Sequence, residues 1–110
     1  MAIQLIIQQV GPLPIKATFN SLTNGPVYLE VNGSVWTQSA NKMIGIGIQI
    51  DGNLVGTAKI FSNGASTHRA AVPAYIALKL DQGQHTITLV AQDATTVSDF
   101  NDLYTAVIHY

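Results

Sequence analysis

The sequence contains no cysteine and few charged residues, and both absences narrow what the protein can be. Without cysteine the chain has no disulfides, no thiolate metal ligands and no thiol nucleophile. Charged residues make up 10 % of the chain and the formal net charge is −1, whereas charged residues make up about 25 % of a typical soluble domain. Such a surface offers no basic footprint for nucleic acid or for an anionic membrane.

Long apolar runs and helical periodicity are also absent. No segment approaches the roughly 20 apolar residues of a membrane-spanning helix, and the opening MAIQLIIQQV lacks the basic segment that begins a secretory signal. We therefore expect no membrane insertion. We expect cytoplasmic synthesis, which leaves later assembly into a particle or surface structure open. At 110 residues the whole chain, 1–110, is expected to form one domain.

What is present is an alternation of apolar and polar residues along nearly the whole chain. Seven to nine such segments, separated by turn residues, predict an all-β fold, an antiparallel β-sandwich of the jelly-roll type. A short strand is expected around Val35 and Trp36, and a break at Pro73 within 68–80. The alternation predicts one shared core formed by Val27, Leu29, Ile44, Ile46, Ile48, Ile50, Ile87 and Leu89.

The clearest local signal is the stretch MIGIGIQIDGNLVG, Met43–Gly56. Asp51-Gly52 is a typical hairpin turn between two alternating strands. Gly45 and Gly47 weaken the strand, so something must lie close to them, either an aromatic side chain of the adjacent strand or another subunit. Scarce charge favours the subunit, which predicts an interface at Gly45, Gly47 and Gln49. In a monomer, valine at both glycines should be neutral or stabilising.

Three loops at one end of the sandwich are expected to carry any ligand site, because loops on a rigid scaffold carry function more often than strand faces. They are 36–42, 62–69 and 93–102. Trp36 is either a stacking surface for a sugar or a core residue with its indole N–H hydrogen-bonded. Arg69, the single arginine, either grips a carboxylate or is an unpaired strand-end residue. The predicted ligand contacts are Trp36, Arg69, Asp99, Asn101, Asp102 and Tyr104.

The acidic segment QDATTVSDFNDLY has two interpretations. Its oxygen ligands suit calcium, while Asp and Asn also shape turns through local hydrogen bonds. The calcium candidates are Asp93, Asp99, Asn101 and Asp102. The three histidines, His68, His85 and His109, are placed on three different strands without metal-ligand spacing and are interpreted as independent surface or edge residues. No metal or other cofactor is predicted.

The segments GSVWT, IQIDGNLVG, GQHTITLVA and DFNDLYTAVIHY, spread over Gly33–Tyr110, resemble compact jelly-roll modules of bacterial and phage surface fibres. Those modules are related to the tumour-necrosis-factor and complement-type jelly rolls. The resemblance implies a trimeric binding or structural module without catalysis.

Two functions remain open on the sequence. The first is a non-catalytic, homo-oligomeric β-sandwich that binds carbohydrate, as a lectin does, or builds a fibre or capsid. Abundant neutral polar side chains and the lack of a G-x-S-x-G nucleophile motif favour it. The second is a small metal-assisted hydrolase that uses the 99–102 loop with a histidine.

Overall fold

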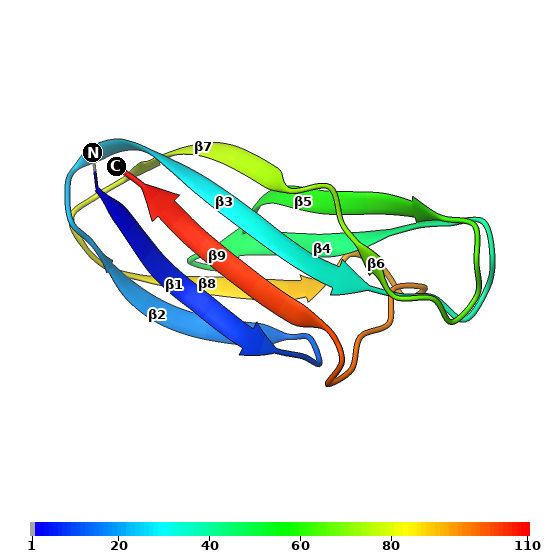
Figure 1. Ribbon diagram of the computed structural model, residues 1–110. Helices are drawn as coiled ribbons and strands as arrows, with labels where there is room; N and C mark the ends of the chain where they lie inside the picture. The colour runs from blue at the N-terminus through cyan, green and yellow to red at the C-terminus, as the bar shows by residue number, and fades with distance from the viewer. Residues whose placement is uncertain (1) are drawn as a thin grey trace.

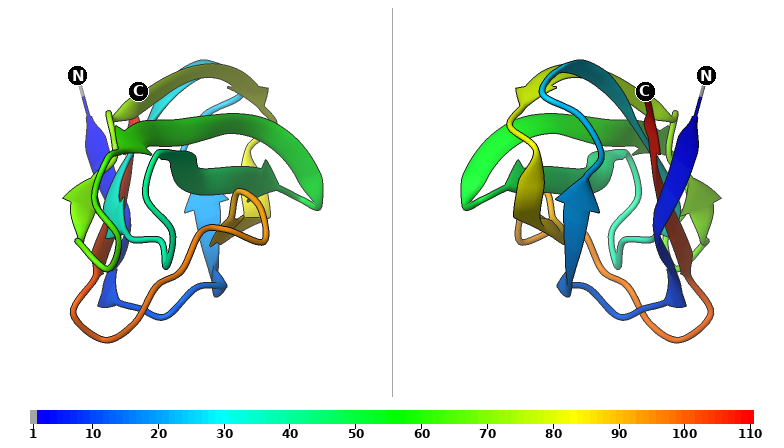
Figure 2. Two further views of the ribbon diagram at one scale, coloured as in Figure 1. Left: turned by 90° about the vertical axis from the view of Figure 1, so that its right-hand side faces the viewer. Right: turned by 90° about the vertical axis from the view of Figure 1, so that its left-hand side faces the viewer.

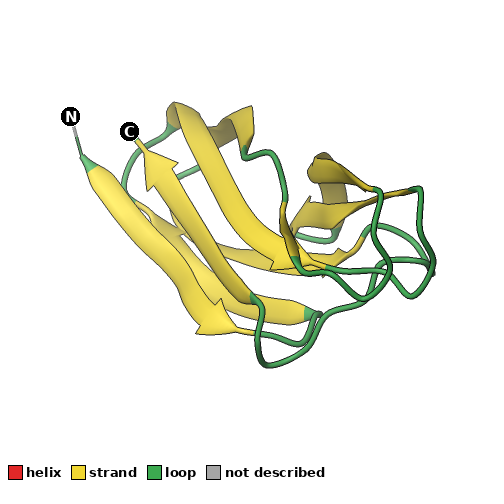
Figure 3. Cartoon of the chain, turned by 45° about the vertical axis from the view of Figure 1, so that its right-hand side comes forward, coloured by secondary structure: helices red, strands yellow, loops and turns green. Residues whose placement is uncertain are grey.

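The computed structural model describes residues 2–110, which form nine strands and, within that range, no helix (Figures 1 and 3). Nothing in that range is a helix able to span a bilayer. The strands are β1 (Ile3–Val10), β2 (Ile15–Ser21), β3 (Gly25–Val35), β4 (Lys42–Ile50), β5 (Asn53–Ser62), β6 (Arg69–Ala70), β7 (Ala74–Leu80), β8 (Gly83–Ala91) and β9 (Leu103–His109).

The strands form two antiparallel sheets that pack face to face. One sheet has the order β1-β9-β3, and β3 pairs along its other edge with β7 and, at its end, with β6. The second sheet has the order β2-β8-β4-β5. Figure 2 shows the two layers from both ends of the molecule. The predicted all-β antiparallel sandwich is confirmed.

The core lies between the two sheets and contains the side chains that the alternation predicted. All eight predicted residues are at most 5 % exposed. On β3, for example, Val27, Leu29 and Val31 point inward while Tyr28 and Glu30 point to the outer face. Successive side chains of a strand point to opposite faces. Once the inward residues of β3 are known, the outward residues follow from the alternation.

One predicted strand boundary differs from the structure, and two other local predictions agree with it. No separate short strand forms around Val35 and Trp36 in the described chain: Val35 ends the long strand β3, which pairs with β9, β7 and β6, and Trp36 follows in an isolated bridge with Val97. The predicted break at Pro73 is confirmed, because Pro73 lies between β6 and β7. Asp51 and Gly52 form the expected hairpin with positive φ at both residues, 51° and 84°.

The space beside the two glycines of β4 is filled by the same chain. A Cβ atom at Gly45 would lie 2.4 Å from the carbonyl oxygen of Ala58 and 2.7 Å from Oε1 of Gln92, and one at Gly47 would lie 2.9 Å from Cγ2 of Val90. The covering side chains come from the strand or loop alongside, as one alternative expected, but none is aromatic. Contact of Gly45, Gly47 and Gln49 with another subunit stays a prediction.

Candidate functional site

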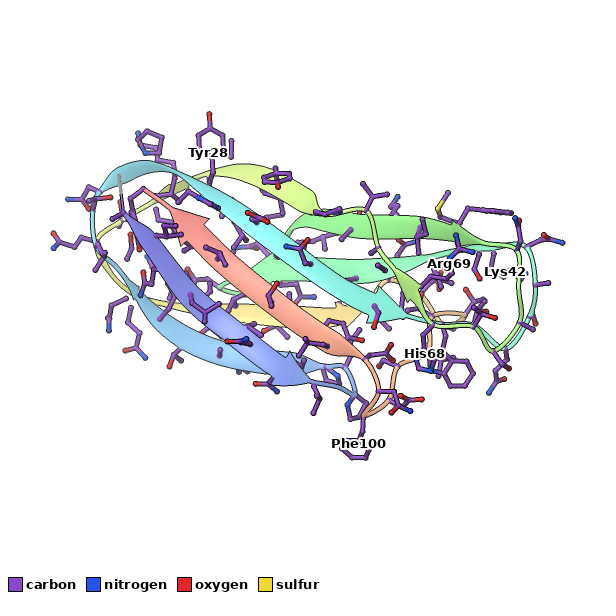
Figure 4. The ribbon with its side chains drawn as sticks, in the orientation of Figure 1. Tyr28, Lys42, His68, Arg69 and Phe100 are labelled. Atoms are coloured by element: carbon purple, nitrogen blue, oxygen red, sulfur yellow. The ribbon has the colours of Figure 1, made fainter. Side chains whose placement is uncertain are left out.

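The three predicted loops meet at one end of the sandwich. Trp36 and Val97 exchange two backbone hydrogen bonds of 2.9 and 2.8 Å, which join the first loop to the third. The N–H of Ser66 donates to the carbonyl of Thr37 at 2.7 Å, which joins the second loop to the first. Figure 4 shows His68, Arg69 and Lys42 at this end and Tyr28 at the other. The expectation that these loops lie together is confirmed.

A buried carboxylate, Asp102, ties the loops to the sheet. Its side chain is 0 % exposed. Oδ1 accepts hydrogen bonds from the hydroxyl of Ser34 at 2.6 Å and from Nδ1 of His68 at 2.7 Å, and Oδ2 accepts from the backbone N–H of Asp99 at 2.9 Å. Buried polar groups of this kind need all their partners. Asp102, predicted as a ligand contact, is therefore an anchor of the loops within the protein.

The groups that remain accessible lie next to this anchor. Because Nδ1 of His68 donates to Asp102, Nε2 is the free ring nitrogen, and it lies 3.7 Å from Oδ2 of Asp99. The two side chains are 35 % and 38 % exposed. The ring of Phe100, next in the chain, is 75 % exposed, and Asn101 is exposed as well. An exposed aromatic ring, that of Phe100, therefore lies at the same end of the molecule as the hydrogen-bonding groups of His68 and Asp99.

The three other predicted ligand contacts, Tyr104, Trp36 and Arg69, differ in how far they are buried. Tyr104 is completely buried, which makes it a core residue, and its place as a ligand contact is wrong; burial, with Asp102 nearby, raises the pKa of its hydroxyl. Trp36 is half-buried, with its ring centroid 5.7 Å from that of His68. Its indole N–H is buried and has no hydrogen-bond partner among residues 2–110. Arg69 is half-buried on β6 and, over the same residues, forms no ion pair.

The four calcium candidates do not act together. Oδ1 of Asp93 accepts hydrogen bonds from the backbone and hydroxyl groups of Thr95 and Thr96, which is the turn-shaping role. Asp99 likewise accepts from the backbone of Asn101 at 2.8 Å. The clustered ligand atoms in the described chain belong instead to His68, Asp99 and Asp102, within 4.8 Å of one another.

The three histidines lie apart from one another, as expected, and each pairs with a different carboxylate from a distant part of the chain. Besides His68 with Asp102, His85 contacts Asp51 at 2.6 Å and His109 contacts Glu30 at 3.0 Å. His68 precedes β6 rather than lying within a strand. The hydrogen bond to Asp102 raises the pKa of His68, and the hydrogen bond to Asp51 raises the pKa of His85. The same bond from His85 lowers the pKa of Asp51.

These pairs predict that thermal stability is greatest in mildly acidic solution. The raised pKa values of His68 and His85 add stability that is complete below the unfolded value of 6.5 and is lost as the pH rises through the folded values. The lowered pKa of Asp51 adds stability that is present above 3.8 and is lost as the pH falls through its folded value. We expect melting temperatures measured between pH 3 and pH 9 to peak at about pH 5 to 6.

The matched variant is His85→Gln, which removes the ionisable pair formed by His85 and Asp51. In this variant the melting temperature should fall less steeply above pH 6.5 than in the unmodified protein. Melting temperatures that stay level from pH 6 to pH 9 in the unmodified protein would contradict the assignment of these pairs.

Sequence reasoning missed the part that His68, Ser34 and Phe100 play at this end. Ser34 lies 68 positions and His68 lies 34 positions from Asp102 along the chain. Only the pairing of β3 with β6 and β9 brings them together. The one available signal for Phe100 was an aromatic residue inside the polar segment SDFND, because a large ring in a polar loop is often left exposed.

No protein-family model matches the chain, and no curated protein matches it. Solved structures do match. A family 35 carbohydrate-binding module from an environmental isolate is similar with a TM-score of 0.54 and 12 % identity, over 88 % of this chain and 66 % of that chain. The sugar-binding C-terminal domain of EclA has a TM-score of 0.53 and 16 % identity, over 98 % of this chain and 79 % of that one.

A third similar structure is dimeric latent PorU from Porphyromonas gingivalis, with a TM-score of 0.59 and 10 % identity, over 97 % of this chain and 12 % of that one. The chain thus spans just under two thirds of the first of these proteins and a small part of the third. At such identities the likeness establishes the fold, a jelly-roll β-sandwich. It supports the predicted jelly-roll resemblance and does not support the relation to tumour-necrosis-factor and complement-type modules.

Proposed function

We propose that the protein is a non-catalytic carbohydrate-binding module whose ligand docks at the loop end. The main support for this proposal is the exposed pair formed by Nε2 of His68 and Oδ2 of Asp99, which lie 3.7 Å apart. These two atoms offer hydrogen-bonding groups side by side, as two adjacent sugar hydroxyls require. The exposed ring of Phe100 supplies an apolar face for the C–H side of a sugar. The similar fold of a family 35 carbohydrate-binding module and of the sugar-binding EclA domain supports the proposal.

The alternative, a metal-assisted hydrolase, receives less support from the same residues. Both oxygens of Asp102 already accept hydrogen bonds, and the carboxylate is completely buried. A metal ion bound by His68, Asp99 and Asp102 would first have to break the contact between His68 and Asp102. The cluster of His68, Asp99 and Asp102 therefore supports binding better than metal-assisted catalysis.

The test is a glycan array followed by titration calorimetry with the best ligand. Arg69→Ala and Asp99→Asn should each weaken binding by about tenfold or more, because a lost charged hydrogen bond costs about 1.5 to 3 kcal/mol. Melting temperatures should stay nearly unchanged, since the Asp99 side chain is 38 % exposed. Asp81→Asn, an exposed carboxylate in the β7–β8 turn, is the control and should bind as the unmodified protein does. Full affinity in both loop variants would remove this end from consideration.

Self-association into a homo-oligomer stays a prediction of the poorly charged sequence, and a trimer stays what the resemblance to surface-fibre modules implies. Molar mass in solution measures it directly. A monomer at all concentrations would contradict it and would leave the binding proposal standing.

A further inference from the structure

A second surface suited to a ligand lies far from the loop end, on the outer face of the β1-β9-β3-β7 sheet. It is a groove of about 490 Å³ lined by Pro26, Tyr28, Tyr75, His109 and Tyr110. That volume lies within the range of about 300 to 1,000 Å³ that small-molecule sites occupy. Figure 4 shows Tyr28 toward the end of the molecule opposite to Arg69 and Lys42, and the longest extent of the chain is 43 Å.

Strand register builds this groove from three neighbouring strands. Tyr28 of β3 lies opposite Ala77 of β7 and His109 of β9. Two residues further along β3, Glu30 lies opposite Tyr75. The two tyrosines therefore stand diagonally on one face, close enough for rings to border a common surface. They are 59 % and 68 % exposed, so neither ring is used by the core.

A fixed carboxylate borders the two rings. Glu30 accepts hydrogen bonds from Nδ2 of Asn32 at 3.1 Å and from Nε2 of His109 at 3.0 Å, and its side chain remains 24 % exposed. Hydrogen bonds from Asn32 and His109 lower the pKa of Glu30, so the carboxylate is ionised at neutral pH. A carboxylate has about four lone-pair directions, so accepting sites remain for a ligand hydroxyl.

We infer that this groove is a second saccharide-binding site, which takes a neutral sugar by stacking on Tyr28 and Tyr75 and by hydrogen bonding to Glu30. Exposed aromatic rings beside a preset acceptor match the two chemical faces of a sugar ring, its C–H side and its hydroxyls. An anionic sugar is disfavoured by the ionised Glu30, although Lys79, in register with Pro26 at the rim, offsets part of that charge.

A second copy of the chain fits the groove less well. Five lining residues are few beside the roughly 20 to 30 residues per side of a stable protein interface. A two-fold contact through the groove would also place the Glu30 carboxylates of both copies close to each other, since such interfaces are self-complementary. The rings carry hydroxyl groups that a dry protein contact would have to satisfy.

The experiment is a titration of the ¹⁵N-labelled protein, followed by NMR, with cellohexaose, xylohexaose, mannohexaose and trigalacturonic acid. One or more of the neutral oligosaccharides should shift the amide signals of Tyr28, Tyr75 and His109. Tyr28→Ala and Tyr75→Ala should each weaken that binding by about tenfold or more, and Tyr75→Phe should retain most of it. The control is Phe61→Ala, which removes a ring 46 % exposed on the other sheet and should change nothing.

The outcomes separate this site from the loop end. Shifts that vanish in Tyr28→Ala and persist in Asp99→Asn support the groove, whatever happens at the loops. Shifts confined to the loop end, unchanged in Tyr28→Ala, overturn the groove and leave the proposed function intact. If trigalacturonic acid binds the groove more tightly than the neutral oligosaccharides do, the inference that the groove takes a neutral sugar is overturned. A dimer in solution that Tyr28→Ala dissociates assigns the groove to protein contact. No shift at the groove with any of the three neutral oligosaccharides overturns the groove and leaves the loop end to the glycan array.

Discussion

Replacing Asp102 by alanine should lower the free energy of unfolding by about 3 to 5 kcal/mol, because several hydrogen bonds to a buried charged acceptor are lost together. Three donors lose their acceptor at once, namely the hydroxyl of Ser34, Nδ1 of His68 and the backbone N–H of Asp99. The carboxylate is completely buried, so water does not replace it without a rearrangement of the loop. Urea unfolding followed by tryptophan fluorescence measures the change, because Trp36 lies beside His68.

Asp99→Asn is the matched control, since it alters a neighbouring carboxylate that is 38 % exposed. Its cost should be within about 0.5 kcal/mol of zero, as for other exposed substitutions. Asp102→Asn should cost less free energy of unfolding than Asp102→Ala and more than Asp99→Asn. The amide side chain has the shape of the carboxylate and keeps one acceptor oxygen. Equal stability of Asp102→Ala and Asp99→Asn would show that the network contributes nothing to folding.

Gly45→Val should destabilise the protein by about 3 kcal/mol, at the upper end of the usual cost of overpacking. A Cβ atom there would lie 2.4 Å from the Ala58 carbonyl oxygen and 3.1 Å from Cα of Lys59, which are backbone atoms of the paired strand β5. Relief would require β4 and β5 to separate. These distances argue against the expectation that valine is harmless in a monomer, since that expectation considered strand propensity and not the neighbouring backbone.

Gly47→Val is the internal comparison and should cost about 1 kcal/mol. The atom nearest to its Cβ, at 2.9 Å, is a side-chain methyl group of Val90, which can rotate away. Thermal unfolding of the two single variants measures the difference, together with molar mass in solution. A Gly45→Val protein that melts as high as the unmodified one would mean that β5 yields easily at this point.

The fold was predictable because its information is local. Alternation placed Ile44, Ile46 and Ile48 in the core, and Asp51-Gly52 fixed the hairpin that follows. Neither feature depends on knowing which strands pair. The extent of β3 was not predictable in the same way, since Gly33 and Ser34 have weak strand preferences and are held in a strand by the pairing of β3 with β9 and β6.

The candidate sites depend on register, which the sequence does not state. The three loops were correctly placed at one end, but the sequence could not show which of their polar residues face solvent. Asp102 and Tyr104 alternate with the exposed Leu103, so both turn inward at the start of β9. Tyr28 and Glu30 share the outer face of β3, as the alternation of inward and outward residues along the strand requires. Their partners Tyr75 and His109 lie 45 and 79 positions from Glu30, and only the finished sheet brings them beside it.

The position of β9 has a consequence for the order of folding. This strand is the last of the nine, yet it lies between β1 and β3 and pairs with both. During synthesis, β1 and β3 must wait for Leu103–His109 with their facing edges unpaired, and such edges are prone to pair with other chains. Contacts that close over nearly the whole chain are entropically slow to form. We therefore expect the β1-β9-β3 sheet to assemble in one late step, with stalled chains as the species most exposed to aggregation.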